Sequence, residues 1–323
     1  MTRITRRTAI AGATLAPFAV ARAQAPWPDR PVRLVVPFTP GGSTDILARA
    51  MGQRLAEIFG QPFVIENRPG AGGTLGSEHV FRSAPDGHTL IMGHIGTLAA
   101  NPALYRNLAF DIAAFVPVAL VANVANFLVV TNRLEATDVR SLIALAKRDP
   151  GRLTYGSGGN GSAAHISMVA FMEATGTEMT HVPYRGTGPM MTDLISGTIQ
   201  LTMTGGPPAL PPVRAGQLRA LGISSLERLP AANDIPTIAE QGIPGFQALQ
   251  WYGIIAPPGT PAPLVARLNE ACNRILGEAP FRARLETEGA TAHPMTPAQF
   301  GAYIASERER WGALIRRTNV TLG

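Results

Sequence analysis

The sequence contains very little cysteine, since Cys272 is the only one among 323 residues. A single cysteine excludes a disulfide within the chain. Cys272 lies in a segment whose apolar residues recur at helical spacing, so we interpret it as a packed core residue and not as a nucleophile. The residues that share this spacing are Leu264, Leu268, Ile275 and Leu276.

The motifs of common catalytic and metal sites are also absent from the sequence. The chain has no G-x-S-x-G elbow, no G-x-x-x-x-G-K-[ST] loop and no H-E-x-x-H pair, and its six histidines show no metal-ligand spacing. These absences argue against a serine-hydrolase elbow, a nucleotide P-loop and a zinc site. We therefore expect no metal and no cofactor.

Two weaker patterns occur close together in the middle of the chain. The segment 156–161 matches G-x-G-x-x-G, but the strand before it is short and polar, and Glu173 and Glu178 precede the next strand instead of ending it. Ser162 and His165 are three residues apart on one predicted helix, with no orienting carboxylate nearby. We prefer a capping serine with a histidine on the helix face to a nucleotide site or a nucleophile–base pair.

The chain has few charges, and its basic excess is concentrated at the N-terminus. Charged residues make up 15% of the sequence, and the formal net charge is +6. Arg3, Arg6, Arg7 and Arg22 lie in a segment without acids, and removing these four charges lowers the net charge from +6 to +2. No basic cluster is interleaved with aromatic residues, so the sequence does not favour a nucleic-acid partner.

The N-terminus has the parts of an export signal. A twin-arginine-like basic region at 5–10 is followed by an apolar stretch at 9–21 that is too short to span a bilayer. Ala21-Arg22-Ala23 is an A-x-A site, so we expect residues 1–23 to be cleaved after about Ala23; a cut after Ala25 would place Pro26 next to it. The mildly apolar stretch favours the twin-arginine route over unfolded export, and a retained anchor is the alternative to cleavage. No other long apolar run is present.

The stretch from Arg33 to Asp45 predicts a strand, a glycine turn and a helix start. Arg33–Phe38 is short and apolar, and Gly41-Gly42 can adopt φ > 0. We expect Ser43 or Thr44 to cap the helix and Asp45 to occupy its first turn. Such a helix start presents free N–H groups and hydroxyls, which can bind an anion. The alternative is a well-capped corner with no ligand.

Strand-like and helix-like segments alternate in two similar runs. Each run reads β-α-β-α-β, which is typical of a parallel sheet with helices on both faces. The first run has segments 33–38, 44–59, 63–66, 74–83 and 89–92, and the second has 153–155, 162–174, 179–184, 189–196 and 199–204. A final amphipathic helix is expected at 296–318.

Two apolar segments can connect these runs. Residues 115–131 form one or two predicted strands that can pass from the first run to the second, and 248–256 can return. We therefore expect an α/β protein with two lobes, each a mixed, mainly parallel sheet flanked by helices. The expected lobes are 26–122 plus 250–323, and 123–249. Ligands bind at the carboxyl ends of such strands, so the cleft between the lobes is the expected site.

A second glycine-rich turn resembles the first. Ser157, Asn160 and Ser162 offer polar side chains beside a helix start, and Arg185 follows the next strand in a glycine turn. Arg185 can pair with an anionic ligand or face solvent. Because no acid–base or nucleophilic group accompanies these turns, the sequence favours binding over catalysis.

Five motifs together resemble one protein family. These are Pro37–Asp45, Glu66-Asn-Arg-Pro-Gly-Ala-Gly-Gly73, Tyr155-Gly-Ser157, His181-Val-Pro-Tyr-Arg-Gly186 and Trp251-Tyr-Gly253. Their order and spacing resemble the extracytoplasmic solute receptors of tripartite tricarboxylate transporters, the Bug proteins, over nearly all of the mature chain.

The resemblance implies a two-lobe, type II-like periplasmic binding protein that closes on a carboxylate. In such receptors, loops matching Phe38–Asp45 and Ser157–Ser162 hold the ligand from opposite lobes, and the loop 94–97 lines the same cleft. The expected ligand-binding residues are Phe38, Thr39, Gly42, Ser43, Thr44, Asp45, Thr97, Ser157, Asn160, Gly161, Ser162, Arg185, Gly186 and Thr204. The implied partners are the membrane components of a transporter or a sensor kinase, and the receptor is expected to be a monomer.

One departure from the family pattern concerns the ligand. Members commonly carry acids in the strand that here contains Gln200 and Thr204. An acid there could bind an amino group, so we expect a mono- or dicarboxylate without an amine. The alternative to a receptor is an exported hydrolase-like or dehydrogenase-like enzyme that uses the loop Gly156–Ser162. A third interpretation is a binding protein that now has only a regulatory role.

Overall fold

The computed structural model describes residues 27–105, 107–318 and 320 of the chain. The expected export signal, residues 1–23, lies outside the described residues. Within them, no helix combines the length and the apolar character needed to cross a bilayer.

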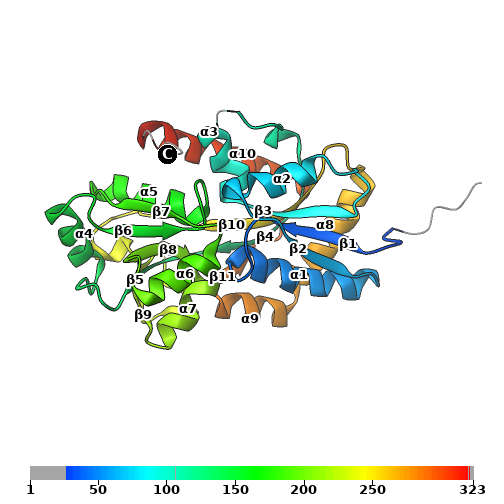
Figure 1. Ribbon diagram of the computed structural model, residues 1–323. Helices are drawn as coiled ribbons and strands as arrows, with labels where there is room; N and C mark the ends of the chain where they lie inside the picture. Colours follow the sequence, from blue (N-terminus) through cyan, green and yellow to red (C-terminus); the bar gives the residue numbers. More distant parts are fainter. Residues whose placement is uncertain (1–26, 106, 319, 321–323) are drawn as a thin grey trace, which may run out of the picture.

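Two separate β-sheets organise the described residues. The first sheet has the strand order β11-β4-β10-β3-β1-β2, and the second has the order β7-β6-β8-β5-β9. Figure 1 shows the sheets side by side, with the second on the left. The strands of the first sheet are β1 (Val32–Val36), β2 (Phe63–Asn67), β3 (Thr89–His94), β4 (Val116–Val124), β10 (Gln250–Ala256) and β11 (Ala290–Ala292). Those of the second are β5 (Asn126–Thr131), β6 (Thr154–Ser157), β7 (Thr180–Pro183), β8 (Leu201–Gly205) and β9 (Leu218–Ile223).

Both sheets are mixed. The strands of each predicted β-α-β-α-β run pair in parallel, as β2-β1-β3 and as β7-β6-β8. The connecting strands β4, β5 and β10 add only antiparallel pairs. The apolar stretch 115–131 forms two strands, and β4 lies in the first sheet while β5 lies in the second. The expected fold of two helix-flanked sheets is confirmed, with antiparallel pairs wherever the chain changes lobe.

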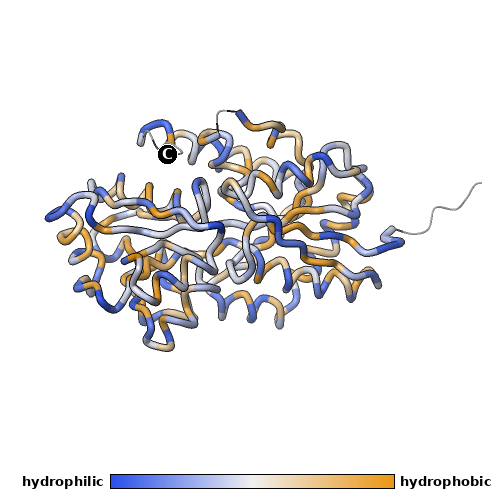
Figure 2. The backbone as a smooth tube through the Cα atoms, viewed as in Figure 1, coloured by the Kyte–Doolittle hydropathy of each residue, from blue (hydrophilic) through white to orange (hydrophobic). Residues whose placement is uncertain are grey.

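Helices cover both faces of the first sheet. Alternate residues of a strand face opposite sides, so Leu34 packs among residues of α1 (Ser43–Phe59) and α8 (Ala262–Gly277), whereas Val35 packs with those of α2 (Thr74–Phe81) and α10 (Pro297–Thr318). The two remaining helices of this lobe are α3 (Asn101–Leu104) and α9 (Ala279–Thr287). In Figure 2, hydrophobic and hydrophilic residues alternate along these helices, which fits one buried and one exposed face.

The second sheet is covered in the same way. Leu128 and Val130 of β5 face the cluster that contains α5 (Ala163–Thr175), while Phe127 and Val129 face the cluster of α6 (Thr187–Ser196) and α7 (Gly206–Arg214). Helix α4 (Val139–Arg148) begins with a capping box between Asp138 and Ser141. The second lobe therefore repeats the layered plan of the first.

The last helix links the two lobes. Trp311 and Leu314 of α10 belong to the same hydrophobic cluster as Phe171 of the second lobe. Arg317 Nε also lies 3.0 Å from a carboxylate oxygen of Glu173 in α5. Helix α10, which lies in the segment expected in the first lobe, thus contacts both lobes.

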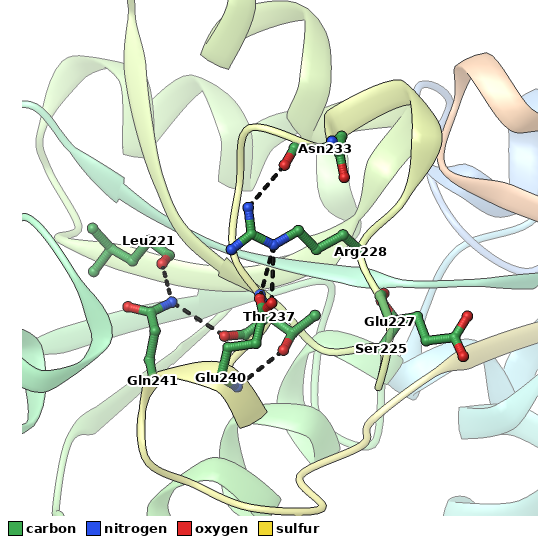
Figure 3. Close-up of polar contacts among 8 residues, drawn as sticks. All are labelled: Leu221, Ser225, Glu227, Arg228, Asn233, Thr237, Glu240 and Gln241. Atoms are coloured by element: carbon green, nitrogen blue, oxygen red, sulfur yellow. Dashed lines mark hydrogen bonds and ion pairs between the residues drawn. The ribbon is translucent and has the colours of Figure 1, made fainter.

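Side-chain hydrogen bonds help to hold the segment between β9 and β10 (Figure 3). Glu240 accepts hydrogen bonds from the Thr237 N–H at 2.6 Å and from Arg228 Nε at 2.9 Å. Gln241 donates to the carbonyl of Leu221 at 2.8 Å and accepts from the Val139 N–H at 2.9 Å. These bonds fix the loop on the second sheet before the chain returns to the first.

Candidate functional site

The turn after β1 forms the first of three loops at the cleft, the first cleft loop (residues 37–42). Gly41 has φ +88°, and the N-cap of α1 is Gly42, which makes no side-chain capping bond. The expectation that Ser43 or Thr44 caps the helix is therefore wrong, because Gly42 takes the N-cap position and both residues lie in the first turn of α1. Both residues are buried.

Asp45 fixes the first cleft loop through hydrogen bonds of its carboxylate. Its carboxylate accepts hydrogen bonds from the Gly41 N–H at 3.1 Å, from Asn67 Nδ2 at 3.0 Å and from Arg49 Nη2 at 2.9 Å. Burial acts to raise the pKa of Asp45, but the bonds from Arg49, Asn67 and Gly41 outweigh it and lower the pKa. The carboxylate is thus ionised and its oxygens are occupied within the protein.

The second cleft loop (residues 157–162) precedes α5. Ser162 is the N-cap of α5, and its Oγ accepts the His165 N–H at 3.4 Å, so the predicted capping role is confirmed. Ser157 Oγ accepts the Gly159 N–H at 3.1 Å and lies 2.6 Å from His181 Nε2. Burial lowers the pKa of His181 to about 4, so this ring is neutral at pH 7.

The third cleft loop (residues 94–97) follows β3 and leads into a π-helical turn, Gly96–Ala100. His94 Nδ1 accepts the Gly96 N–H at 2.6 Å, and the Thr97 hydroxyl donates to the His94 carbonyl at 3.1 Å. The His94 ring stacks on Phe38 with a centroid separation of 4.6 Å. The first and third cleft loops therefore support each other.

The loops of the two lobes are in close contact through glycines. A Cβ at Gly186 would lie 1.9 Å from Thr39 Oγ1, and a Cβ at Gly42 would lie 3.0 Å from Thr187 Oγ1. On the other side of the cleft, a Cβ at Gly96 would lie 2.3 Å from the Gly161 carbonyl oxygen. Side chains at these positions would hold the lobes apart.

A small inner cavity lies between the lobes where these loops meet. Its volume is about 30 Å³, which is room for about one water molecule. No charged side chain lines it. The lining residues are Phe38, Gly42, Ser43, Thr44, His94, Gly158, Ser162, Ala163, Ala164, Thr187, Thr204, Gln250 and Tyr252.

An outer cavity adjoins the inner one and shares Phe38 and Gly158 with it. Its volume is about 520 Å³. It lies between loops of the two lobes and is lined in addition by Pro69, Gly70, Ala71, Gly72, Gly73, Leu75, Tyr105, Gly159, Asn160, Pro183, Tyr184 and Arg185. The two cavities together form the cleft.

The predicted site residues fall into four groups. Those on the inner cavity are Phe38, Gly42, Ser43, Thr44, Ser162 and Thr204, and those on the outer cavity are Phe38, Asn160 and Arg185. Thr39 and Gly186 meet where the lobes touch. Asp45, Thr97, Ser157 and Gly161 line neither cavity and form hydrogen bonds within or behind the loops.

Of the polar residues that line the inner cavity, Thr187, Gln250 and Tyr252 were missed from the sequence, and His94 was expected only as part of the loop 94–97. Tyr252 lies within the motif Trp251-Tyr-Gly253 and His94 begins the loop 94–97, so position on the returning strand or in a predicted loop was the available signal. Gln200 was expected near the site but its Oε1 accepts the Thr154 N–H at 2.7 Å, and it lines a separate cavity of about 420 Å³ at the far end of the second lobe. We assign the site to the cleft because two helix N-termini point there.

A buried chain of amides connects the cleft to the segments that join the lobes. The Tyr252 hydroxyl donates to Gln250 Oε1, and Gln250 Nε2 donates to Asn126 Oδ1. Burial raises the pKa of Tyr252, while hydrogen bonds with the hydroxyls of Ser43 and Thr44 act in the opposite sense. We call Asn126, Gln250 and Tyr252 the hinge network.

Comparison with known proteins identifies the family. Residues 47–320 match the family model described as tripartite tricarboxylate transporter family receptor. The protein BugT of Bordetella pertussis is 36% identical over 298 residues, which cover 92% of this chain and 91% of BugT.

Two solved structures are similar over almost the whole fold. Rpa4515 of R. palustris with adipate has a TM-score of 0.89 and 39% identity, covering 91% of this chain and 99% of that one. MatC (Rpa3494) from Rhodopseudomonas palustris with bound malate has a TM-score of 0.85 and 37% identity, covering 90% and 100%. The fold, the paired helix starts and these matches agree: the chain belongs to the receptor family of tripartite tricarboxylate transporters and is a solute-binding protein, not an enzyme.

Proposed function

We propose that this receptor is exported to the periplasm, captures a small mono- or dicarboxylate between its lobes, and delivers it to transporter membrane components or to a sensor kinase. The observation that carries the proposal is the inner cavity. It is formed by the starts of two helices from different lobes and contains no charged side chain. Bound adipate and malate in the two structural relatives support a carboxylate ligand.

Backbone amides supply most of the anion-binding potential. The first N–H groups of a helix have no partner within the helix. In α1 these belong to Ser43 and Thr44, and in α5 to Ala163 and Ala164, and all four residues line the inner cavity. Both helix dipoles present their positive ends there. A carboxylate can thus be held from both sides without a cation.

No acidic residue of the described part of the chain lines the inner cavity, and this limits the class of ligand that the cavity can bind. Thr204 lines the cavity, and no Asp or Glu does. A ligand ammonium group would lose its hydration there without gaining a counter-charge, which is unfavourable. Gln200 takes no part in this argument, because it lies elsewhere. We therefore favour a carboxylate without an amino group.

We further propose that the lobes move about the two connecting segments. The division of the strands between two sheets supports the expected lobes, 26–122 plus 250–323 and 123–249, and we propose Ala125, between β4 and β5, as the first boundary. The second boundary precedes β10. Hinge opening about these points would separate the glycine contacts and admit a ligand to the cleft.

A carboxylate panel tests the receptor function. Mature protein should be stabilised saturably by at least one of malate, adipate and shorter mono- and dicarboxylates in thermal unfolding, without turnover of the ligand. Turnover that Ser162→Ala abolishes would instead establish an enzyme. Binding of aspartate or glutamate without binding of any plain carboxylate would refute the amine-free ligand. Mass spectrometry of ligand released from natively purified protein would identify it.

Substitution of Gly42 tests the first cleft loop directly. Gly42→Val should weaken carboxylate binding about tenfold or more, because its side chain would meet Thr187 across the cleft and fill space beside the free amides. Gly42 has φ −88°, which valine adopts readily, so unfolding of the ligand-free protein should change little. Isothermal titration calorimetry and thermal unfolding provide both readouts, and unchanged affinity would make the turn a structural corner only.

A further inference from the structure

Two buried histidines, one in each lobe, use the same ring nitrogen to hold the backbone of a cleft loop. His94 ends β3 and His165 lies in the first turn of α5. Both residues are only 3% exposed to solvent. Neither was among the predicted site residues.

In the first lobe, His94 fixes the third cleft loop. Its Nδ1 accepts the Gly96 N–H at 2.6 Å and the Thr97 N–H at 3.2 Å. The ring is held in place by stacking on Phe38 and by an edge-to-face contact with Tyr252, whose centroid is 6.0 Å away. Phe38, His94 and Tyr252 all line the inner cavity.

In the second lobe, His165 fixes the end of the second cleft loop. Its Nδ1 accepts the Gly161 N–H at 3.0 Å. Gly161 has φ +77°, a conformation that turns its amide back toward the helix. The ring stacks on His181 at 4.0 Å, and His181 in turn stacks on Tyr155 at 4.9 Å.

The two loops that these histidines hold press against each other. A Cβ on Gly96 would come within 2.3 Å of the Gly161 carbonyl oxygen, so the two backbones are in close contact. The Gly96 and Gly161 amides are the ones that point at the rings. A change in either turn would therefore alter how the lobes close.

We propose that His94 and His165 are positioning residues for carboxylate binding: as neutral Nδ1 acceptors, they set the two glycine turns that meet when the lobes close. This inference rests on the proposed receptor function. A neutral imidazole that accepts at Nδ1 carries its proton on Nε2. Protonation of Nδ1 would place a donor against the glycine N–H and disrupt the turn.

The surroundings of both rings favour the neutral form. Tyr252 is the titratable group facing His94, and Tyr155 and His181 are those facing His165. Burial lowers the pKa of His94 to about 4. Burial, and then repulsion from His181, lower the pKa of His165 to about 3. Among the described residues, no carboxylate, lysine or arginine contributes to either shift.

Matched substitutions at each histidine test the proposal. Asparagine places an amide oxygen near the position of Nδ1, whereas leucine has similar bulk and no acceptor. We expect His94→Leu and His165→Leu to weaken binding of the best panel carboxylate at least about tenfold, and the asparagine variants to stay within about threefold of wild type. Equal loss in the leucine and asparagine variants, or no loss in either, would overturn the positioning role.

Two readouts remain informative if a leucine variant fails to fold. Nitrogen NMR of the unliganded wild-type protein should show both rings as the Nε2–H tautomer, and an Nδ1–H tautomer would contradict the proposal. Protonation of the ligand affects the wild-type protein and the double variant His94→Asn/His165→Asn equally, so we compare the ratio of their affinities. The ratio of wild-type affinity to variant affinity should fall as the pH drops below about 5, and a constant ratio would also contradict the proposal. If no carboxylate binds wild type, the receptor function fails, while the tautomer measurement still tests the histidines.

Discussion

Replacing Gly186 by alanine is expected to weaken carboxylate binding strongly. The new Cβ would lie 1.9 Å from Thr39 Oγ1 and 2.9 Å from the Thr39 backbone nitrogen, so rotation of a side chain cannot relieve the whole overlap. Overpacking of this kind costs about 1–3 kcal/mol. Since each 1.4 kcal/mol is a factor of ten, affinity should fall about 10- to 100-fold.

The ligand-free protein should tolerate this change. Gly186 has φ 162° and ψ 178°, an extended conformation that alanine also adopts. All three of the nearest atoms belong to Thr39 of the opposite lobe, so separation of the lobes removes the overlap. The unfolding temperature without ligand should therefore stay within a few degrees of wild type.

A glycine outside the cleft provides the matched control. A Cβ at Gly277, in the last turn of α8, meets no atom within 4 Å, so Gly277→Ala should leave carboxylate affinity unchanged. Titration calorimetry on both variants, with thermal unfolding of the ligand-free proteins, completes the test. Wild-type affinity in Gly186→Ala, or a large loss of stability without ligand, would show that lobe contact at Thr39 is not part of binding.

Local patterns in the sequence were sufficient to predict most of the secondary structure. The continuous apolar run that contains Phe127, Leu128 and Val129 predicts a strand, and in β5 these side chains pack on alternate faces. Strand β11, Ala290–Ala292, was missed because three small or polar residues carry no such pattern. Its identity as a strand depends on pairing with β4, which is distant in sequence.

The candidate site was predictable only where it lies at strand ends. Ser43 and Ser162 follow glycine turns, and such positions indicate a helix start that can bind an anion. Tyr252 and Gln250 lie in a strand whose composition reads as core, and only the antiparallel pairing of β10 with β3 brings Tyr252 opposite His94. Direction and register of pairing between distant strands are set by the whole fold, so the sequence alone does not show that these side chains meet at the cleft.

Asn126 should be the most important polar residue for stability outside the ligand-binding loops. It begins β5, directly after the first connection between the lobes, and is completely buried. Its Nδ2 donates to Ser167 Oγ at 3.0 Å and to the Ala248 carbonyl, and its Oδ1 accepts from Gln250. One side chain thus ties together both connecting segments and α5.

Asn126→Leu preserves the approximate volume but leaves these partners without their hydrogen bonds. Each buried polar group that loses its partner costs about 1–3 kcal/mol, so we expect the free energy of unfolding to fall by about 2–4 kcal/mol. Urea denaturation measures this loss. Exposed Asn132, whose Nδ2 donates to the Gly216 carbonyl at 2.7 Å, is the matched control, and Asn132→Leu should cost no more than about 1 kcal/mol.

The same substitution tests whether the hinge network acts as a unit. Since Gln250 Nε2 donates to Asn126 Oδ1 and Gln250 Oε1 accepts from Tyr252, removing Asn126 frees an amide that also positions a cavity-lining hydroxyl. Asn126→Leu and Gln250→Leu should therefore be non-additive by about 0.5–3 kcal/mol in a double-mutant cycle. Additive losses of stability would mean that the cleft and the hinge are not coupled through this network. A loss of stability at Asn126 equal to that at Asn132 would mean that apolar packing holds the connecting segments.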